Sequence, residues 1–263
     1  MKIIQSYIQK SDNDHLSFYT FMLNYLILKK NYGKVTMYCD KKTYNTVIKH
    51  IPYDEIVIME NVYSNSLLYK IFVIEQQHEK FIYVDPELIF FENSFNMFFE
   101  NKCDLLIQNV NPADILGTNY CVKKNKDFLN KNICNVNNYD GSYFSTNIVG
   151  MTVDFKNKYI SNVKKVLNNT NFKGMFNNEY DSLILEELII YLTYLQNKYK
   201  VVEIMSQSDI ILGEEYCANK HKFIKLNNIT YKSRYIELLK NKIRNNFISD
   251  YYIVDLFEKN INI

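Results

Sequence analysis

The segment FIYVDPELIFFE, from Phe81 to Glu92, decides how the rest of this sequence is interpreted. It begins with an unbroken run of strand-favouring apolar residues, FIYV, and a second apolar run, LIFF, follows directly after DPE. A strand at the edge of a sheet, or with one face in water, would alternate apolar and polar residues. The segment therefore predicts the buried centre of a sheet that is covered on both faces.

Two acidic residues stand at the exit of this predicted strand. Asp85 and Glu87 are two residues apart, so an extended backbone would direct both carboxylates from the same face. Ligands of open α/β sheets bind outside the carboxyl ends of the strands, where two carboxylates suit a hard divalent cation that carries substrate phosphates. Pro86 stiffens the connection between them. The alternative interpretation is a polar turn that only closes a buried strand.

The composition limits the class of protein. A chain of 263 residues with 47% hydrophobic content and a net charge of +2 is long enough for a substantial core in one or two domains. No region carries enough charge to predict a nucleic-acid partner. The five cysteines have no C-x-x-C spacing, so neither a zinc site nor a disulfide framework is expected.

The start of the sequence and its apolar runs bear on location. A strand-like segment follows Met1 and Lys2 directly, without the apolar core of a signal peptide, and nowhere do 18 apolar residues run together. The scattered cysteines are those expected of a reducing compartment. We therefore expect a cytoplasmic protein that at most rests on a membrane.

The first half of the chain alternates predicted strands and helices. Strands are expected at residues 2–8, 34–39, 55–59 and 81–84, and helices after residue 14, at 43–50 and from 66 to about 77. Helices of this length between strands imply βαβ crossovers and a mostly parallel sheet. The sequence therefore predicts an α/β fold.

The second half is less regular. Strands are expected at 104–108, 141–150 and 201–204, short strands at 210–212 and 222–224, and helices at 154–167, 181–196, 233–245 and 249–258. Residues 109–140 are interpreted as a long polar connection, a feature that is usually functional or mobile. Because no linker or repeat is visible, we treat the chain as one domain, with residues 1–230 as its body and 231–263 as a helical C-terminal extension.

The order of these parts resembles the GT-A-fold glycosyltransferases of the small, cytosolic bacterial type, with a more distant similarity to glycogenin and the lipopolysaccharide galactosyltransferases. The matching segments are SLLYKIFVIE, FIYVDPELIF, YFSTNIVGM, LILEELIIYL and HKFIK. The resemblance implies a GT-A-like, Rossmann-like fold with residues 1–230 as the nucleotide-sugar-binding and catalytic region. It implies the transfer of a hexose from a nucleotide diphosphate sugar, such as a UDP- or GDP-sugar, to a hydroxyl of a saccharide or related acceptor, as in polysaccharide biosynthesis.

The resemblance also implies a divalent cation, Mn²⁺ or Mg²⁺, bound by a D-x-D pair after the central strand. That pair falls on Asp85 and Glu87, although the second acid is Glu and Pro86 replaces the usual small residue. His221 is expected as a third metal ligand, and Lys225 is expected to hold the β-phosphate of the leaving group. The related enzymes carry a glycine in this late segment, which here is absent, and the segment is one residue shorter.

Four further residues are expected at the donor by the same resemblance. Lys70 matches a basic residue that contacts the donor, and its alternative role is a solvated lysine on a helix. Ser6, Tyr7 and Asp40 end the first two predicted strands, where the base and ribose of the nucleotide bind in that family.

The candidates for the acceptor side lie later in the chain. Asn147 occupies a polar strand that contacts the sugar or acceptor in the related enzymes. Glu186 and Glu187 interrupt an apolar helix, and carboxylates beside a buried face are costly unless they are paired. We name both as candidates for the catalytic base or for orienting the acceptor hydroxyl. The alternative is that both glutamates lie on the solvent-exposed edge of the helix.

Two other functions stay open on the sequence. The imperfect acidic pair and the missing glycine favour a catalytically silent protein that binds sugar nucleotides or takes part in assembly. A nucleotidyltransferase-like enzyme would share the sheet and the metal-binding acids, but the chain has no glycine-rich phosphate loop.

Overall fold

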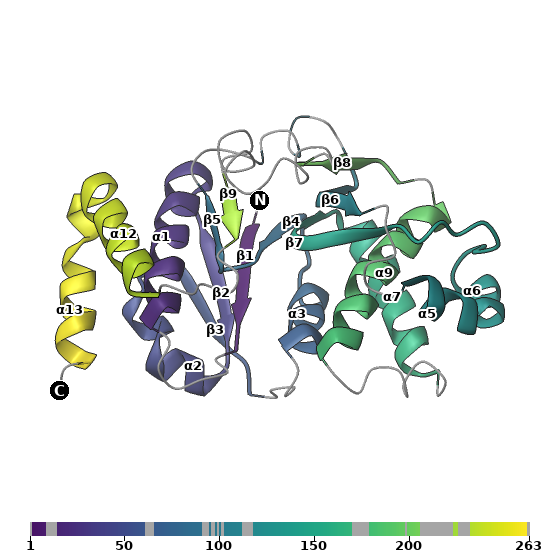
Figure 1. Cartoon of the computed structure of the whole chain (residues 1–263), viewed down its shortest axis with the longest axis horizontal. Helices are drawn as coiled ribbons and strands as arrows, with labels where there is room; N and C mark the ends of the chain where they lie inside the picture. The colour runs from purple at the N-terminus through teal and green to yellow at the C-terminus, as the bar shows by residue number, and fades with distance from the viewer. Residues whose placement is uncertain are drawn as a thin grey trace. The chain divides into compact units, whose positions relative to one another are not determined.

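The computed structural model describes residues 2–8, 15–60, 66–90, 95, 98, 100, 103–111, 118–169, 179–197, 199–205, 223–225 and 232–261. These residues form an α/β fold with a seven-stranded, mostly parallel sheet and flanking helices (Figure 1). The hydrogen-bonded order of the sheet is β3 (Glu55–Ile58), β2 (Val35–Cys39), β1 (Lys2–Tyr7), β4 (Phe81–Val84), β7 (Tyr143–Met151), β6 (Leu105–Asn111) and β8 (Val201–Glu203). The α/β prediction is thereby confirmed.

The segment FIYV has the central place that its composition predicted. β4 is the middle strand of the sheet, and all four of its side chains are buried. The second apolar run forms β5 (Leu88–Phe90), which leaves this sheet and pairs instead with β9 (Phe223–Lys225) in a separate two-stranded sheet.

The chain divides into two compact units. The first, which we name the β1 unit, comprises residues 2–62, 84–93 and 217–263. The second, the β7 unit, comprises Met1 with residues 63–83 and 94–216.

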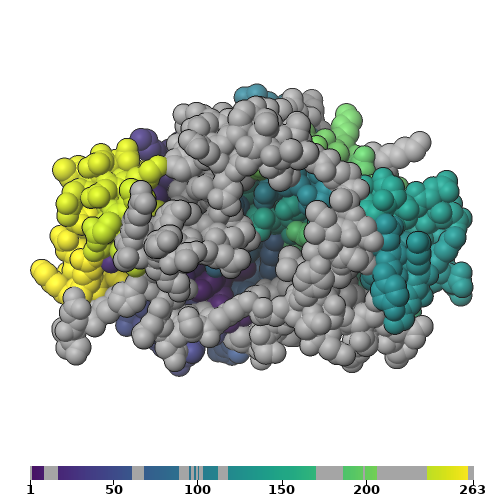
Figure 2. Space-filling model, in the orientation of Figure 1, coloured from purple at the N-terminus to yellow at the C-terminus, as the bar shows by residue number. Residues whose placement is uncertain are grey.

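In the β1 unit, β1, β2 and β3 are all parallel. Its described helical segments are α1 (His15–Tyr32), α2 (Lys41–Thr46), η1 (Ile48–His50), α12 (Lys232–Asn246), η2 (Ile248–Asp250) and α13 (Tyr252–Ile261). α1 packs against α12, and the ring of Phe18 in α1 stacks on Phe257 of α13 at 3.5 Å between centroids. α13 buries Val254 and Phe257 and exposes Tyr252 and Leu256, so it covers the unit with one face while its other face lies at the surface (Figure 2).

In the β7 unit, β7 is antiparallel to β6, and β6 is parallel to β8. The helices among its described residues are α3 (Ser66–Glu75), α5 (Thr118–Lys124), α6 (Lys126–Asn132), α7 (Val153–Leu167) and α9 (Glu179–Asn197). α9 packs against β7 and α7, and α3 packs against both α7 and α9. The side chain of Thr152 caps α7 by accepting from the amide of Phe155 at 3.4 Å.

Two expected elements differ from those observed. Residues 109–140 are not one polar connection, because they contain the end of β6 and the short helices α5 and α6, whose buried residues include Cys121 and Leu129. The helix expected at 43–50 begins earlier, after the cap at Asp40, and ends at Thr46, where Val47 leaves helical geometry with φ −126° and ψ −54°. The strand expected at 210–212 lies outside the described residues.

A membrane-spanning helix needs a long and almost uncharged apolar stretch, and none of the helices in the described part of the chain has one.

Candidate functional site

The residues predicted from the sequence fall into both units. Those expected at the metal and nucleotide belong to the β1 unit, namely Ser6, Tyr7, Asp40, Asp85, Glu87 and Lys225. Those expected at the sugar and acceptor, together with Lys70, belong to the β7 unit, namely Lys70, Asn147, Glu186 and Glu187. His221 lies outside the described residues.

The acidic pair occupies a tight turn. The amide of Leu88 donates to the backbone carbonyl of Asp85 at 3.0 Å, and the amide of Glu87 donates to Oδ1 of Asp85 at 3.0 Å. Aspartate at the first position and proline at the second are favoured in turns of this kind, because the carboxylate bonds the backbone two residues on and proline fixes φ. The structural alternative raised by the sequence, a polar turn, is therefore present. An ionised carboxylate has about four acceptor sites, so a role in the turn and a role at a cation are compatible in principle.

Asn24 of α1 supports this turn and was not identified from the sequence. Its side chain is fully buried, and Nδ2 donates to the carbonyls of Asp85 at 3.4 Å and Pro86 at 3.3 Å. Its Oδ1 has no hydrogen-bond partner among the described residues. The available signal was an amide inside the apolar run LNYLIL of a helix, since buried polar side chains are normally held by hydrogen bonds.

The β5–β9 pair brings the acidic turn to the late basic segment. The two strands are antiparallel, with Leu88 opposite Lys225, Ile89 opposite Ile224 and Phe90 opposite Phe223. Leu88 directly follows Glu87, so the backbone of Lys225 lies beside the end of the turn. α1, which carries Asn24, packs against β5. Two segments far apart in the sequence, the DPE turn and the FIK strand at residues 223–225, are therefore neighbours within the β1 unit.

The ends of β1 and β2 are level with each other. Ser6 pairs with Tyr38, Tyr7 pairs with Cys39, and Asp40 follows directly. Asp40 caps α2, because its Oδ1 accepts from the amide of Thr43 at 2.8 Å. The ring of Tyr7 meets Phe21 edge-on at 4.6 Å between centroids. The three predicted residues thus share one edge of the parallel strands, where ligands of such sheets bind, and Asp40 has a structural task there as well.

In the β7 unit, Lys70 and Glu186 form a buried ion pair. The ammonium Nζ of Lys70 lies 2.5 Å from Oε1 of Glu186 and 2.6 Å from the backbone carbonyl of Thr146, and it stands over the ring of Tyr83 at 4.4 Å. The side chains are only 11% and 2% exposed. Lys70 is therefore not a solvated helix lysine. Because loss of one partner would leave a buried charge uncompensated, the pair fixes α3 and α9 against β7.

Tyr159 lies near this pair, and the other predicted residues of the unit are held elsewhere on β7 and α9. Tyr159 of α7 is fully buried, and burial together with the nearby Glu186 carboxylate raises the pKa of its hydroxyl well above the ordinary value, because both disfavour the phenolate. Glu187 is also buried. Glu186 and Glu187 are therefore both buried inside the unit rather than on a solvent-exposed edge of the helix. Asn147 is half-buried and donates from Nδ2 to Oε1 of Gln108 at 3.0 Å, which joins β7 to β6.

A divalent cation would require ligands from more than one segment. Among the described residues, no group of three or more histidine, cysteine, aspartate or glutamate side chains comes together as a metal site. The third ligand expected from the sequence, His221, is not among those residues. The two carboxylates of the turn are ligands of the kind that Mn²⁺ and Mg²⁺ prefer.

Comparison with known proteins adds no family to this picture. No protein-family model matches the sequence, and a search of curated proteins finds no match. The function must be inferred from the residues of this chain.

Proposed function

We propose that this protein is a metal-assisted glycosyltransferase that moves a hexose from a nucleotide diphosphate sugar to a hydroxyl of a saccharide or related acceptor. The observation that supports the proposal most is the β5–β9 pair, which puts the backbone of Lys225 beside the Asp85–Glu87 turn. A diphosphate with its cation needs carboxylates and a positive charge, and the backbone positions that carry these residue types are close in the β1 unit.

In this proposal, Asp85 and Glu87, with His221, hold the cation. A bound Mn²⁺ or Mg²⁺ would neutralise the charge that develops on the leaving diphosphate. Lys225 would bind the β-phosphate and stabilise the same charge. Ser6, Tyr7 and Asp40, at the ends of β1 and β2, would bind the nucleoside.

The candidates for the acceptor side in the proposal are Asn147, Glu186 and Glu187, which belong to the β7 unit. The ion pair of Lys70 and Glu186 gives these two residues a positioning role, because each already neutralises the other. Glu187 is then the remaining candidate for the base, and Asn147 for a contact with the sugar or acceptor. The enzyme would work in the cytoplasm or at the inner face of the membrane, where nucleotide sugars are used.

A catalytically silent sugar-nucleotide-binding protein is the second candidate. It is favoured by the hydrogen bond that Asp85 accepts from the amide of Glu87, which gives the first acid of the pair a structural function that needs no metal. It is favoured as well by the ion pair of Glu186, one of the two candidate bases.

A binding panel tests the proposal and separates the candidates. UDP-, GDP-, CMP- and dTDP-sugars are titrated into the full chain by calorimetry, with Mn²⁺ and again with EDTA. We expect one donor to bind only with Mn²⁺ and to be hydrolysed slowly during prolonged incubation, because water replaces the acceptor. Binding without hydrolysis would favour the silent protein, and absence of binding across the panel would contradict both candidates.

A further inference from the structure

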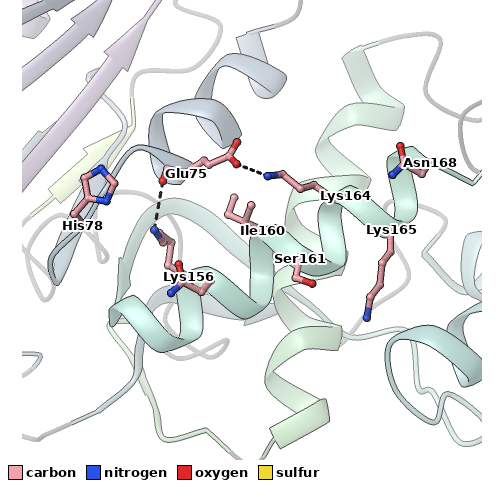
Figure 3. A pocket seen from close by; sticks show the side chains of 9 residues that line it. Glu75, His78, Lys156, Ile160, Ser161, Lys164, Lys165 and Asn168 are labelled. Carbon is pink, nitrogen blue, oxygen red and sulfur yellow. Dashed lines mark hydrogen bonds and ion pairs between the residues drawn. The ribbon is translucent and has the colours of Figure 1, made fainter.

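A cavity of about 600 Å³ opens on the β7 unit, among residues that the proposed function does not use. It is formed by one face of α7 and by the C-terminal end of α3, and its lining includes Glu75, His78, Lys156, Ser161, Lys164 and Lys165 (Figure 3). A volume of this size is typical of sites for small molecules.

The lining is positively charged. Three of its residues are lysines and one is a glutamate, so its formal charge is +2 when His78 is neutral. Ser161, Asn157 and Asn168 add uncharged hydrogen-bonding groups. Such a lining favours an anionic ligand over a cationic one, because a cation would meet an excess of ammonium groups.

Lys156 supplies a buried charge to the cavity. Its side chain donates to the carbonyl of Gln77 at 2.6 Å and to that of Glu75 at 3.3 Å, at the end of α3. Burial lowers the pKa of Lys156, because the charged form loses hydration. Carbonyl oxygens carry no net charge, so an anion close to Lys156 would stabilise its ammonium further.

The carboxylate of Glu75 is itself an oxyanion that contacts one of the lysines lining the cavity. Its carboxylate lies 2.5 Å from Nζ of Lys164. Lys156 and Lys164 both point toward Glu75 from the same face of α7, whereas Lys165 points away and donates to the carbonyl of Asn132 at 2.9 Å (Figure 3). The pair of Glu75 and Lys164 is substantially exposed, with side-chain exposures of 33% and 61%, so another anion can exchange for Glu75 at little cost.

We propose that this cavity binds a small ligand through a phosphate-type oxyanion, with Lys164 and Lys156 as the cationic contacts and Ser161 as a hydroxyl donor. The site shares no residue with the proposed nucleotide site of the β1 unit. Its anion binding needs no divalent cation, because lysines supply the positive charge.

The test is a titration of the full chain with inorganic phosphate and with pyrophosphate in EDTA, followed by NMR or calorimetry. EDTA removes divalent cations, so a metal-dependent donor site does not bind under these conditions. The cavity proposal is therefore tested separately from the proposed function. Wild type should bind in the millimolar range or tighter. Lys164→Gln should weaken the affinity about three- to tenfold, since it removes one contact charge. Glu75→Gln should tighten it by a similar factor, since it removes the competing carboxylate and releases Lys164.

Lys158→Gln is the matched control, because Lys158 belongs to the same helix and does not line the cavity. Its affinity should equal that of wild type. Lys156 is left intact because it satisfies the last carbonyls of α3. No binding by wild type in EDTA would overturn the proposal, as would an unchanged affinity in Glu75→Gln. An equal loss in Lys158→Gln and Lys164→Gln would overturn it too, since it would indicate attraction by overall charge rather than by a site.

Discussion

Leu88 and Lys225 face each other across the antiparallel β5–β9 pair. This relationship connects the acidic turn after β4 to a segment near the other end of the chain. The sequence predicted that DPE and HKFIK serve the same diphosphate. The pairing brings the backbone of Lys225 next to the end of the DPE turn within the β1 unit. The proposed function depends on this relationship more than on any other.

Lys225→Gln should weaken the binding of a nucleoside diphosphate much more than that of the monophosphate. The reason is that Lys225 is proposed to hold the β-phosphate, which the monophosphate lacks. Calorimetry with UDP and UMP, or with the donor base that the panel identifies, measures the difference in Mn²⁺. Lys222→Gln, the neighbouring lysine, is the control. Equal losses for the diphosphate and monophosphate would contradict the assignment.

Removal of one partner from the ion pair of Lys70 and Glu186 should strongly destabilise the β7 unit. Glu186→Gln leaves a buried ammonium without its carboxylate, so the free energy of unfolding should fall by about 3–5 kcal/mol. Urea denaturation measures the free energy of unfolding of each variant. The double variant Lys70→Met/Glu186→Leu should lose less than Glu186→Gln alone, because it removes both charges.

Glu75 and Lys164 provide the matched comparison, since their ion pair has the same length of 2.5 Å but is exposed. Lys164→Met should cost about 0–1 kcal/mol, because water screens the pair. Equal losses in Glu186→Gln and Lys164→Met would show that burial does not govern these interactions.

Asn24→Ala should loosen the turn that carries the acidic pair. Both hydrogen bonds from Asn24 are long, at 3.4 and 3.3 Å, so their joint loss should cost about 1 kcal/mol of unfolding free energy rather than more. Metal-dependent nucleotide binding should weaken with it. Asn241→Ala, at an exposed position of α12, controls for the higher helix propensity of alanine. A more stable Asn24→Ala protein would argue against the contact.

Cys39 should make the protein less stable at alkaline pH. Burial, aided by the neighbouring Asp40 carboxylate, raises the pKa of its thiol from 9.0 to about 12. A raised pKa means that the unfolded state loses the proton first, so this stability is complete below pH 9 and is lost as the pH rises toward 12. In Cys39→Ala, the decline of unfolding free energy with pH should be shallower by about 1.4 kcal/mol per pH unit in that window. Identical slopes would refute the assignment.

Much of the fold was predictable because local composition and tertiary environment agree. FIYV is apolar on both faces and is the central, fully buried β4. α5 and α6 were missed because each is only 7 residues long, too short to display a helical period, and their sequences TNYCVKK and KDFLNKN are largely polar. The early start of α2 follows from the cap at Asp40, which the sequence assigned to the nucleotide instead.

The candidate site was predictable in its residue types more than in their partners. Lys70 and Glu186 each attracted attention as a charge among apolar neighbours, but only the packing of α3, β7 and α9 makes them an ion pair. The turn at Asp85 follows the Asp-Pro pattern that the sequence already displayed. Its contact with Asn24 depends on how α1 packs near β5, which no local pattern encodes.

Asp85→Asn tests the central claim most directly. Asparagine keeps the oxygen that accepts from the amide of Glu87, so the turn and the melting temperature should be preserved while the charge is lost. Asp255→Asn, at an exposed position of α13, is the control. Calorimetry of nucleotide diphosphate binding with and without Mn²⁺ is the measurement. The proposed function predicts that the metal-dependent part of the binding disappears in Asp85→Asn and survives in Asp255→Asn. Unchanged metal-dependent binding in Asp85→Asn would contradict it.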